Sequence, residues 1–251
     1  MQSSNQHPLA VNANKASDAS AAGPFTTMVN IFVAPGEAFQ ALREKPTVLF
    51  PLAAVLLSTL AVNAWYFQIV DYAWFTDNLL ERMSNLSDEQ REAMRAYTSE
   101  SSSMTSLTSV LGSAISILAV YILQAGYLTL VSALAGDRFR FRHWFSLTSW
   151  TNLPYLLVVL VMAVNLLLSP NGQISLFELN SLSLSNLGVE SGGNFLLQNM
   201  LDSMHLPMFW ALALTVAGYQ QWLQCGHARA AAIVLAPFVL VFGTMAFFAF
   251  N

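Results

Sequence analysis

Five long apolar runs constrain this chain more than any other feature. They cover residues 48–70, 110–135, 145–168, 206–223 and 230–250, and none of them contains Asp, Glu, Lys or Arg. A bilayer core about 30 Å thick needs roughly 20 helical residues at 1.5 Å each. Because lipid cannot hydrogen-bond an open backbone, runs of this kind become helices. The runs therefore predict an all-α, polytopic membrane protein with a five-helix transmembrane bundle.

The composition agrees with this fold class. Hydrophobic residues make up 55% of the chain and charged residues 10%, where a soluble domain carries about 25% charged residues. Five spans and their loops leave no room in 251 residues for a separate soluble domain. We expect residues 1–24, rich in Ser, Asn and Ala, to be a disordered cytoplasmic tail, and residues 25–251 to form the membrane domain.

The charged residues separate by side of the membrane. Segments before the first run, between the second and third, and between the fourth and fifth hold seven of the ten Lys and Arg residues, whereas ten of the fourteen Asp and Glu residues lie in the other two loops. The positive-inside rule then predicts a cytoplasmic N-terminus, an outside C-terminus and a basic inner face. Such a face suits anionic lipid headgroups. We expect a multi-pass protein of the cell inner membrane.

A short amphipathic segment precedes the first run. Pro35 suits the first turn of a helix, where a missing N–H costs nothing, and Phe39 and Leu42 then share one face. Two placements are open: a helix lying on the inner leaflet, or a helix packed on the bundle.

Local signals also mark ends and breaks of helices. In the first outer loop, Ser87 and Gln90 have the spacing of a capping box, which predicts a helix directly after Ser87. Pro154 and Pro237 should kink the third and fifth spans, since proline removes a helix hydrogen bond.

Enzyme signatures are missing from the chain. It contains no H-E-x-x-H, G-x-S-x-G, P-loop or dinucleotide-binding motif. Only clustering of His143, Cys225 and His227 around a cavity would indicate catalysis. We therefore expect no enzymatic activity, no cofactor and no metal, and nucleic acid is not expected as a ligand.

The apolar runs hold amides but no Asp, Glu, Lys, Arg or His. Asn63, Gln124, Asn152 and Gln220 each need a partner between helices, worth roughly 0.5–2 kcal/mol. One interpretation is structural hydrogen bonding. The alternative is a polar path, which would make the chain a transporter, channel or scramblase for lipid or a small solute. Pumps usually carry ionisable groups at mid-membrane, and their absence speaks against active transport.

Residues 136–154 are the densest segment of functional residue types. Arg138, Arg140 and Arg142 alternate with Phe139 and Phe141. On an extended strand, arginines would lie on one side and phenylalanines on the other, so that rings enter the membrane while guanidinium groups hold phosphates. The competing interpretation is an ordinary positive-inside anchor.

Three stretches resemble one family. The first is the F-x-x-P-x-x-A-F lead at residues 32–39 with Lys45-Pro46. The second is G-D-R-F-R-F-R-x-W-F-x-L-x-x-W-x-x-x-P at residues 136–154, and the third is G-H-A-R-A at residues 226–230. Together they resemble the bacterial branch of the Yip family, the Ypt-interacting proteins. This resemblance implies a five-helix membrane domain without known catalytic residues. It also implies kinship with eukaryotic members that act in vesicle traffic and contact Rab-type GTPases.

The leading hypothesis is a non-enzymatic membrane protein of the Yip type that organises lipid or recruits a partner through its basic cytoplasmic face. The expected partners are membrane lipids with anionic headgroups; another membrane or cytoplasmic protein, or a second copy of the chain, is the alternative. The residues expected to bind are Arg138, Arg140, Arg142, His143, Trp150, Asn152 and Arg229.

Overall fold

The fold is helical throughout the residues that the structure describes. The computed structural model describes residues 23–83, 86–100 and 102–250. Within these ranges, helices are joined by loops, and one isolated β-bridge pairs Ser183 with His205. The predicted tail, residues 1–24, lies almost wholly outside the described residues.

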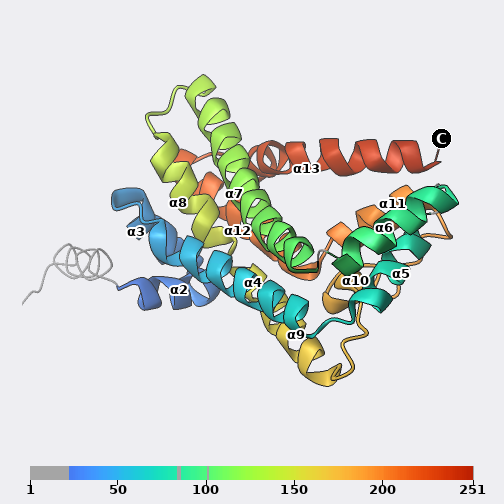
Figure 1. Cartoon of the computed structure of the whole chain (residues 1–251). Helices are drawn as coiled ribbons and strands as arrows, with labels where there is room; N and C mark the ends of the chain where they lie inside the picture. The colour runs from blue at the N-terminus through green and yellow to red at the C-terminus, as the bar shows by residue number, and fades with distance from the viewer. Residues whose placement is uncertain (1–22, 84–85, 101, 251) are drawn as a thin grey trace, which may run out of the picture. The chain divides into compact units, whose positions relative to one another are not determined.

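The helices follow one another along the chain as labelled in Figure 1. In chain order they are α2 (Pro24–Val33), α3 (Pro35–Glu44), α4 (Leu49–Ile69), α5 (Tyr72–Arg82), α6 (Asp88–Glu100), α7 (Ser102–Leu134), α8 (Phe141–Thr151), the 3₁₀ turn η1 (Leu153–Tyr155), α9 (Leu156–Leu168), α10 (Leu176–Leu179), α11 (Phe195–Ser203), α12 (Leu206–Leu223) and α13 (His227–Phe250).

Four stretches of the described chain are long and apolar enough to cross a membrane. They are Leu49–Ile69, Ser102–Leu134, Phe141–Leu168 and His227–Phe250, with mean hydropathies from 1.6 to 2.4. These confirm the all-α, polytopic fold class. The fifth predicted span exists as helix α12 with the predicted bounds but is not among the four, because its last turns carry Gln220 and Gln221. The count of five spans and the orientation of the termini stay predictions.

At Pro154, where a kink was predicted, the helix is interrupted. α8 ends at Thr151, the 3₁₀ turn Leu153–Tyr155 follows, and α9 begins at Leu156. Proline at position 154 cannot donate the helical hydrogen bond, so the chain changes geometry there. Pro237 lies inside α13, which continues past it, and the kink expected there stays a prediction.

The chain divides into two compact units. The first comprises the described part of Met1–Leu52 together with Tyr121–Leu153 and Leu212–Val234; the second comprises Ala53–Val120, Pro154–Ala211 and the described part of Leu235–Asn251. Each has its own buried residues and is considered by itself.

Aromatic rings form the core of the first unit. Trp144, Trp150, Trp222 and Tyr219 are each no more than 2% exposed. The Trp144 ring lies 5.3 Å from that of Tyr219 and 5.4 Å from that of Trp222, centroid to centroid. Pairs at such distances add to the stabilisation that burial of apolar area supplies. This core holds together α3, α8 and the ends of α7 and α12.

Helix α3 packs on the first unit, which decides between its two predicted placements. It begins at Pro35, as expected, and Phe39 and Leu42 are 1% and 2% exposed. The Trp222 indole donates to the carbonyl oxygen of Phe39 at 2.8 Å, and the Gln221 amide donates to that of Gly36, also at 2.8 Å. The apolar face of α3 is therefore covered by protein.

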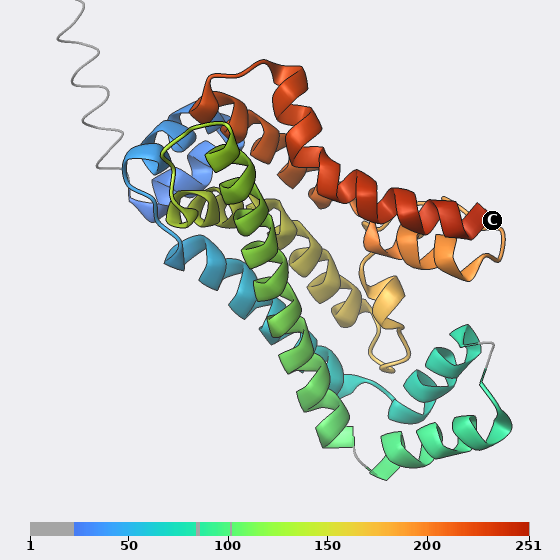
Figure 2. The ribbon, with the colours of Figure 1, turned by 90° about the horizontal axis from the view of Figure 1, so that it is seen from above.

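The second unit has a core of its own around α4 and α9. Its buried cluster consists of Val62, Tyr66, Phe67, Val70, Leu166 and Leu179. In the same unit α5 and α6 lie side by side (Figure 2). The predicted capping box is confirmed, since Gln90 N–H donates to Ser87 Oγ at 3.3 Å and Ser87 N–H donates to Gln90 Oε1 at 2.9 Å.

Candidate functional site

The site begins at a glycine turn that ends α7. Gly136 has φ +82°, its N–H bonds the carbonyl of Ala133 at 3.0 Å, and the N–H of Asp137 bonds that of Ser132 at 3.3 Å. This is the Schellman pattern, which needs a left-handed residue that glycine supplies without strain. The turn fixes the position of Asp137, whose Oδ1 accepts from the N–H of Phe139 at 2.6 Å.

Phe139 points into the protein rather than into lipid. Its ring lies 5.9 Å from Trp144 and 5.3 Å from Trp222, and the guanidinium carbon of Arg43 stands 5.4 Å from its centroid. The last distance suits a cation–π contact. The strand-like alternation expected over residues 138–142 therefore holds only up to residue 140, because α8 begins at Phe141.

The start of α8 orders His143. The N–H of Arg140 donates to Nδ1 of His143 at 3.2 Å, which requires that this nitrogen be unprotonated. The His143 ring meets Phe139 at 5.5 Å and Trp222 at 6.5 Å. Arg138, Arg140 and Arg142 are exposed, so their guanidinium groups remain available to a ligand.

A basic pocket of about 460 Å³ opens beside this turn. It lies entirely within the first unit and is lined by two arginines, a histidine, two aromatic rings and one carboxylate. We call it the basic pocket; its lining residues are Arg43, Asp137, Arg138, Phe139, His143, Trp222, Leu223 and Gln224. Its volume falls within the range usual for ligand sites, about 300–1,000 Å³.

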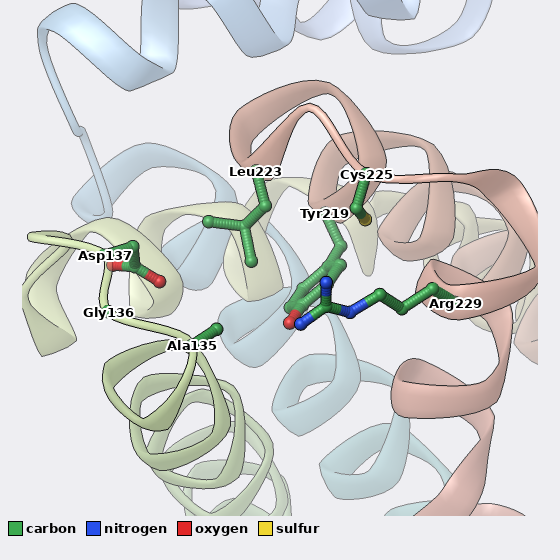
Figure 3. A pocket seen from close by; sticks show the side chains of 7 residues that line it. All are labelled: Ala135, Gly136, Asp137, Tyr219, Leu223, Cys225 and Arg229. Carbon is green, nitrogen blue, oxygen red and sulfur yellow. The ribbon is translucent and has the colours of Figure 1, made fainter.

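A second, smaller pocket of about 180 Å³ adjoins it and shares Asp137 and Leu223. Ala135, Gly136, Tyr219, Cys225 and Arg229 complete its lining. Figure 3 shows the Tyr219 hydroxyl and the Arg229 guanidinium pointing toward one another, with Asp137 on the opposite side. We call it the Tyr219 pocket.

The other two predicted site residues lie inside the unit. The Trp150 indole donates to the carbonyl oxygen of Thr47 at 2.9 Å and to its Oγ1 at 3.1 Å. The Asn152 amide donates to the carbonyl of Thr148 at 2.7 Å and to Gln124 Oε1 at 3.4 Å. These bonds connect parts of the protein, and a binding role for either residue stays a prediction.

The amides predicted to line a polar path bond mostly to nearby protein groups. Gln124 meets Asn152, Gln220 Oε1 lies 3.2 Å from His227 Nδ1, and in the second unit Asn63 donates to the carbonyl of Thr59 in its own helix at 2.9 Å. This pattern matches the structural interpretation of buried amides. The path itself stays a prediction.

The structure brings together some predicted residues and adds others. Arg138 and His143 share the basic pocket, and Arg229 lines the Tyr219 pocket, whereas Arg140 and Arg142 are absent from both linings. Arg43, Asp137 and Tyr219 are among the lining residues that were not predicted as site residues. Sequence signals existed for two of them, since Asp137 belongs to the motif at residues 136–154 and Arg43 lies between the residue 32–39 motif and Lys45-Pro46. Tyr219 stands in an apolar run and carried no such signal.

The side chains considered for catalysis do not gather in one cavity. His143 lines the basic pocket, Cys225 lines the Tyr219 pocket, and His227 faces Gln220. Throughout the described ranges, no group of three or more His, Cys, Asp or Glu side chains could hold a metal ion.

Comparison with protein families decides the kinship of this chain. The family model of the Yip1 domain matches residues 29–249. The chain belongs to the Yip family. Comparison with curated proteins and with solved structures gave no significant match.

The Yip1 match spans both pockets and all four membrane-crossing stretches. The protein is therefore an integral membrane protein of the Yip type, in a family not known for enzymatic activity. Placement in the bacterial branch of the Yip family stays a prediction.

Proposed function

We propose that this Yip-family protein is a non-enzymatic membrane protein whose basic pocket binds the phosphate of anionic lipid headgroups, and that it organises lipid at the cytoplasmic face of the cell inner membrane. The supporting observation is the convergence of Arg43, Arg138 and His143 on one pocket of about 460 Å³. Guanidinium groups hold phosphate oxygens through paired, charge-assisted hydrogen bonds.

The architecture of the pocket favours a lipid over a free ion. Phe139 and Trp222 add apolar rings to its lining, which suit the glycerol region next to a headgroup phosphate. Arg43 is held over the Phe139 ring, so less side-chain freedom is lost when it meets a phosphate. Arg140 and Arg142, exposed beside the pocket, add attraction that salt screens.

Loss of the pocket arginines should weaken binding of anionic lipid. The full chain, purified in a mild detergent, is incubated with mixed micelles of phosphatidylglycerol and phosphatidylcholine, and the retained lipid is measured by mass spectrometry after gel filtration. We expect R43Q/R138Q to retain at least about tenfold less phosphatidylglycerol than the unaltered chain, because each charge-assisted contact contributes roughly 1.5–3 kcal/mol.

A matched control variant loses the same number of positive charges outside the pocket. R91Q/R95Q removes two arginines of α6 in the second unit, where Arg95 pairs with Asp77, and should retain the lipid as before. Equal retention by R43Q/R138Q and the unaltered chain would refute the headgroup role. A fall in both double variants would point to general charge attraction instead of the pocket.

A further inference from the structure

The Tyr219 pocket holds two buried polar atoms for which the described residues 23–83, 86–100 and 102–250 provide no hydrogen-bond partner. Tyr219 is 1% exposed, yet its hydroxyl has no hydrogen-bond partner in the described part of the chain. The same is true of the buried Oδ2 of Asp137. A buried polar atom without a partner costs roughly 1–3 kcal/mol, so two beside one cavity indicate a ligand that satisfies them.

The charges on the walls restrict what that ligand can be. Asp137 supplies a negative charge and Arg229 a positive one, from the loop after α7 and from the start of α13. Within the described residues the two do not pair, as no ion pair joins them within 4.0 Å. An anion would be repelled by the Asp137 carboxylate, and a cation would be repelled by the Arg229 guanidinium. A molecule that carries both charges can place each one next to the side chain of opposite charge.

The volume of the Tyr219 pocket and its hydrogen-bonding groups restrict the class of ligand further. The volume of about 180 Å³ equals that of about six water molecules in the liquid, which admits a small polar group. Asp137 Oδ2 needs a donor, which a primary ammonium has and a trimethylammonium lacks. Trimethylammonium groups are usually bound in cages of several aromatic rings, whereas Tyr219 is the one aromatic residue of this lining.

We propose that the Tyr219 pocket binds a zwitterion in which a short link joins a primary ammonium to a phosphate, as in the headgroup of an ethanolamine phospholipid. The ammonium donates to Asp137 Oδ2, and the phosphate accepts from the Tyr219 hydroxyl and the Arg229 guanidinium. Ala135 and Leu223 border the link between them. This site is separate from the proposed anionic-lipid pocket, although Asp137 and Leu223 line both.

Lipid selectivity tests the proposal. The full chain in mild detergent is offered equal amounts of phosphatidylethanolamine, phosphatidylcholine and phosphatidylglycerol, and retained lipid is counted by native mass spectrometry. A second arm measures competition by soluble glycerophosphoethanolamine. We expect phosphatidylethanolamine to exceed phosphatidylcholine about tenfold, from loss of one charge-assisted contact. Binding of the soluble compound alone would assign the site to a free zwitterion; no preference for either ethanolamine compound overturns the proposal.

Three variants separate this site from the basic pocket. Tyr219→Phe removes a hydroxyl that has no hydrogen-bond partner among the described residues, so it should leave folding intact while ethanolamine selectivity falls. Asp137→Asn keeps an oxygen for the Phe139 N–H and should abolish that selectivity. The matched control Glu44→Gln, an exposed carboxylate at the end of α3, should change neither. Unchanged selectivity in both pocket variants overturns the proposal whatever the result for phosphatidylglycerol.

Discussion

Trp150 holds the segment before the first span in place through hydrogen bonds. Its indole donates to two atoms of Thr47, and the Ser146 hydroxyl donates to the same Thr47 carbonyl at 2.7 Å. Trp150→Phe keeps most of the buried ring but loses the donor. We expect a loss of about 1–2 kcal/mol in the free energy of unfolding, measured by thermal unfolding in detergent. Trp74→Phe serves as the control, because among the described residues the Trp74 indole donates no hydrogen bond, and an equal loss in both variants would contradict this role.

His205 gives the second unit a pH dependence. Burial lowers the pKa of His205 from its ordinary 6.5 to about 4, and its ring meets Tyr155 edge-on at 4.8 Å. Between these values the unfolded chain binds a proton that the folded chain does not, so stability falls as pH decreases from about 6.5 to 4. His205→Gln should flatten this part of the thermal-unfolding profile. An unchanged slope in the variant would assign the dependence to other groups.

At the scale of elements, Arg82 joins the two predicted outer loops of the second unit. Its guanidinium lies 2.9 Å from Asp202 and 3.8 Å from the centroid of Phe177, and Asp202 also accepts from Ser185 and Gln198. Arg82→Lys keeps the charge but loses the planar stack. We expect faster hydrogen exchange in residues 176–203, whereas Arg95→Lys, in an exposed pair with Asp77, should leave it unchanged. Equal exchange in both variants would contradict the joining role.

The helices and their side chains also show which features of the fold sequence patterns can predict. Pro35 and the Ser87–Gln90 box predicted helix starts correctly, because those signals act over three or four neighbouring residues. The predicted direction of the Phe139 side chain, into lipid, was wrong. Alternation of residue types shows which side chains share a side, but not whether lipid or a protein core with Trp144 and Trp222 lies on that side. Tyr219 could not be recognised, since the significance of its hydroxyl depends on Asp137 and Arg229, which are distant in sequence.

At the scale of the whole molecule, the predicted orientation in the membrane can be tested by chemical labelling of the single cysteine. Cys225 borders the Tyr219 pocket on the side predicted to be cytoplasmic. In bacterial spheroplasts, a membrane-impermeant maleimide should label Cys225 only after permeabilisation. Ser191→Cys, placed in the second outer loop of a Cys225→Ser chain, should be labelled at once. Labelling of Cys225 in intact spheroplasts would reverse the orientation and move the basic face outside.

The central claim is that the turn after α7 meets lipid phosphate, and photo-crosslinking tests it most directly. Phosphatidylglycerol with a diazirine on its headgroup is reconstituted with the full chain, illuminated, and the attachment sites are mapped by mass spectrometry. We predict attachment concentrated around Arg43 and residues 136–143, and its loss from these peptides in R43Q/R138Q. Attachment spread evenly over both sides of the membrane, or unchanged in the double variant, would contradict the account.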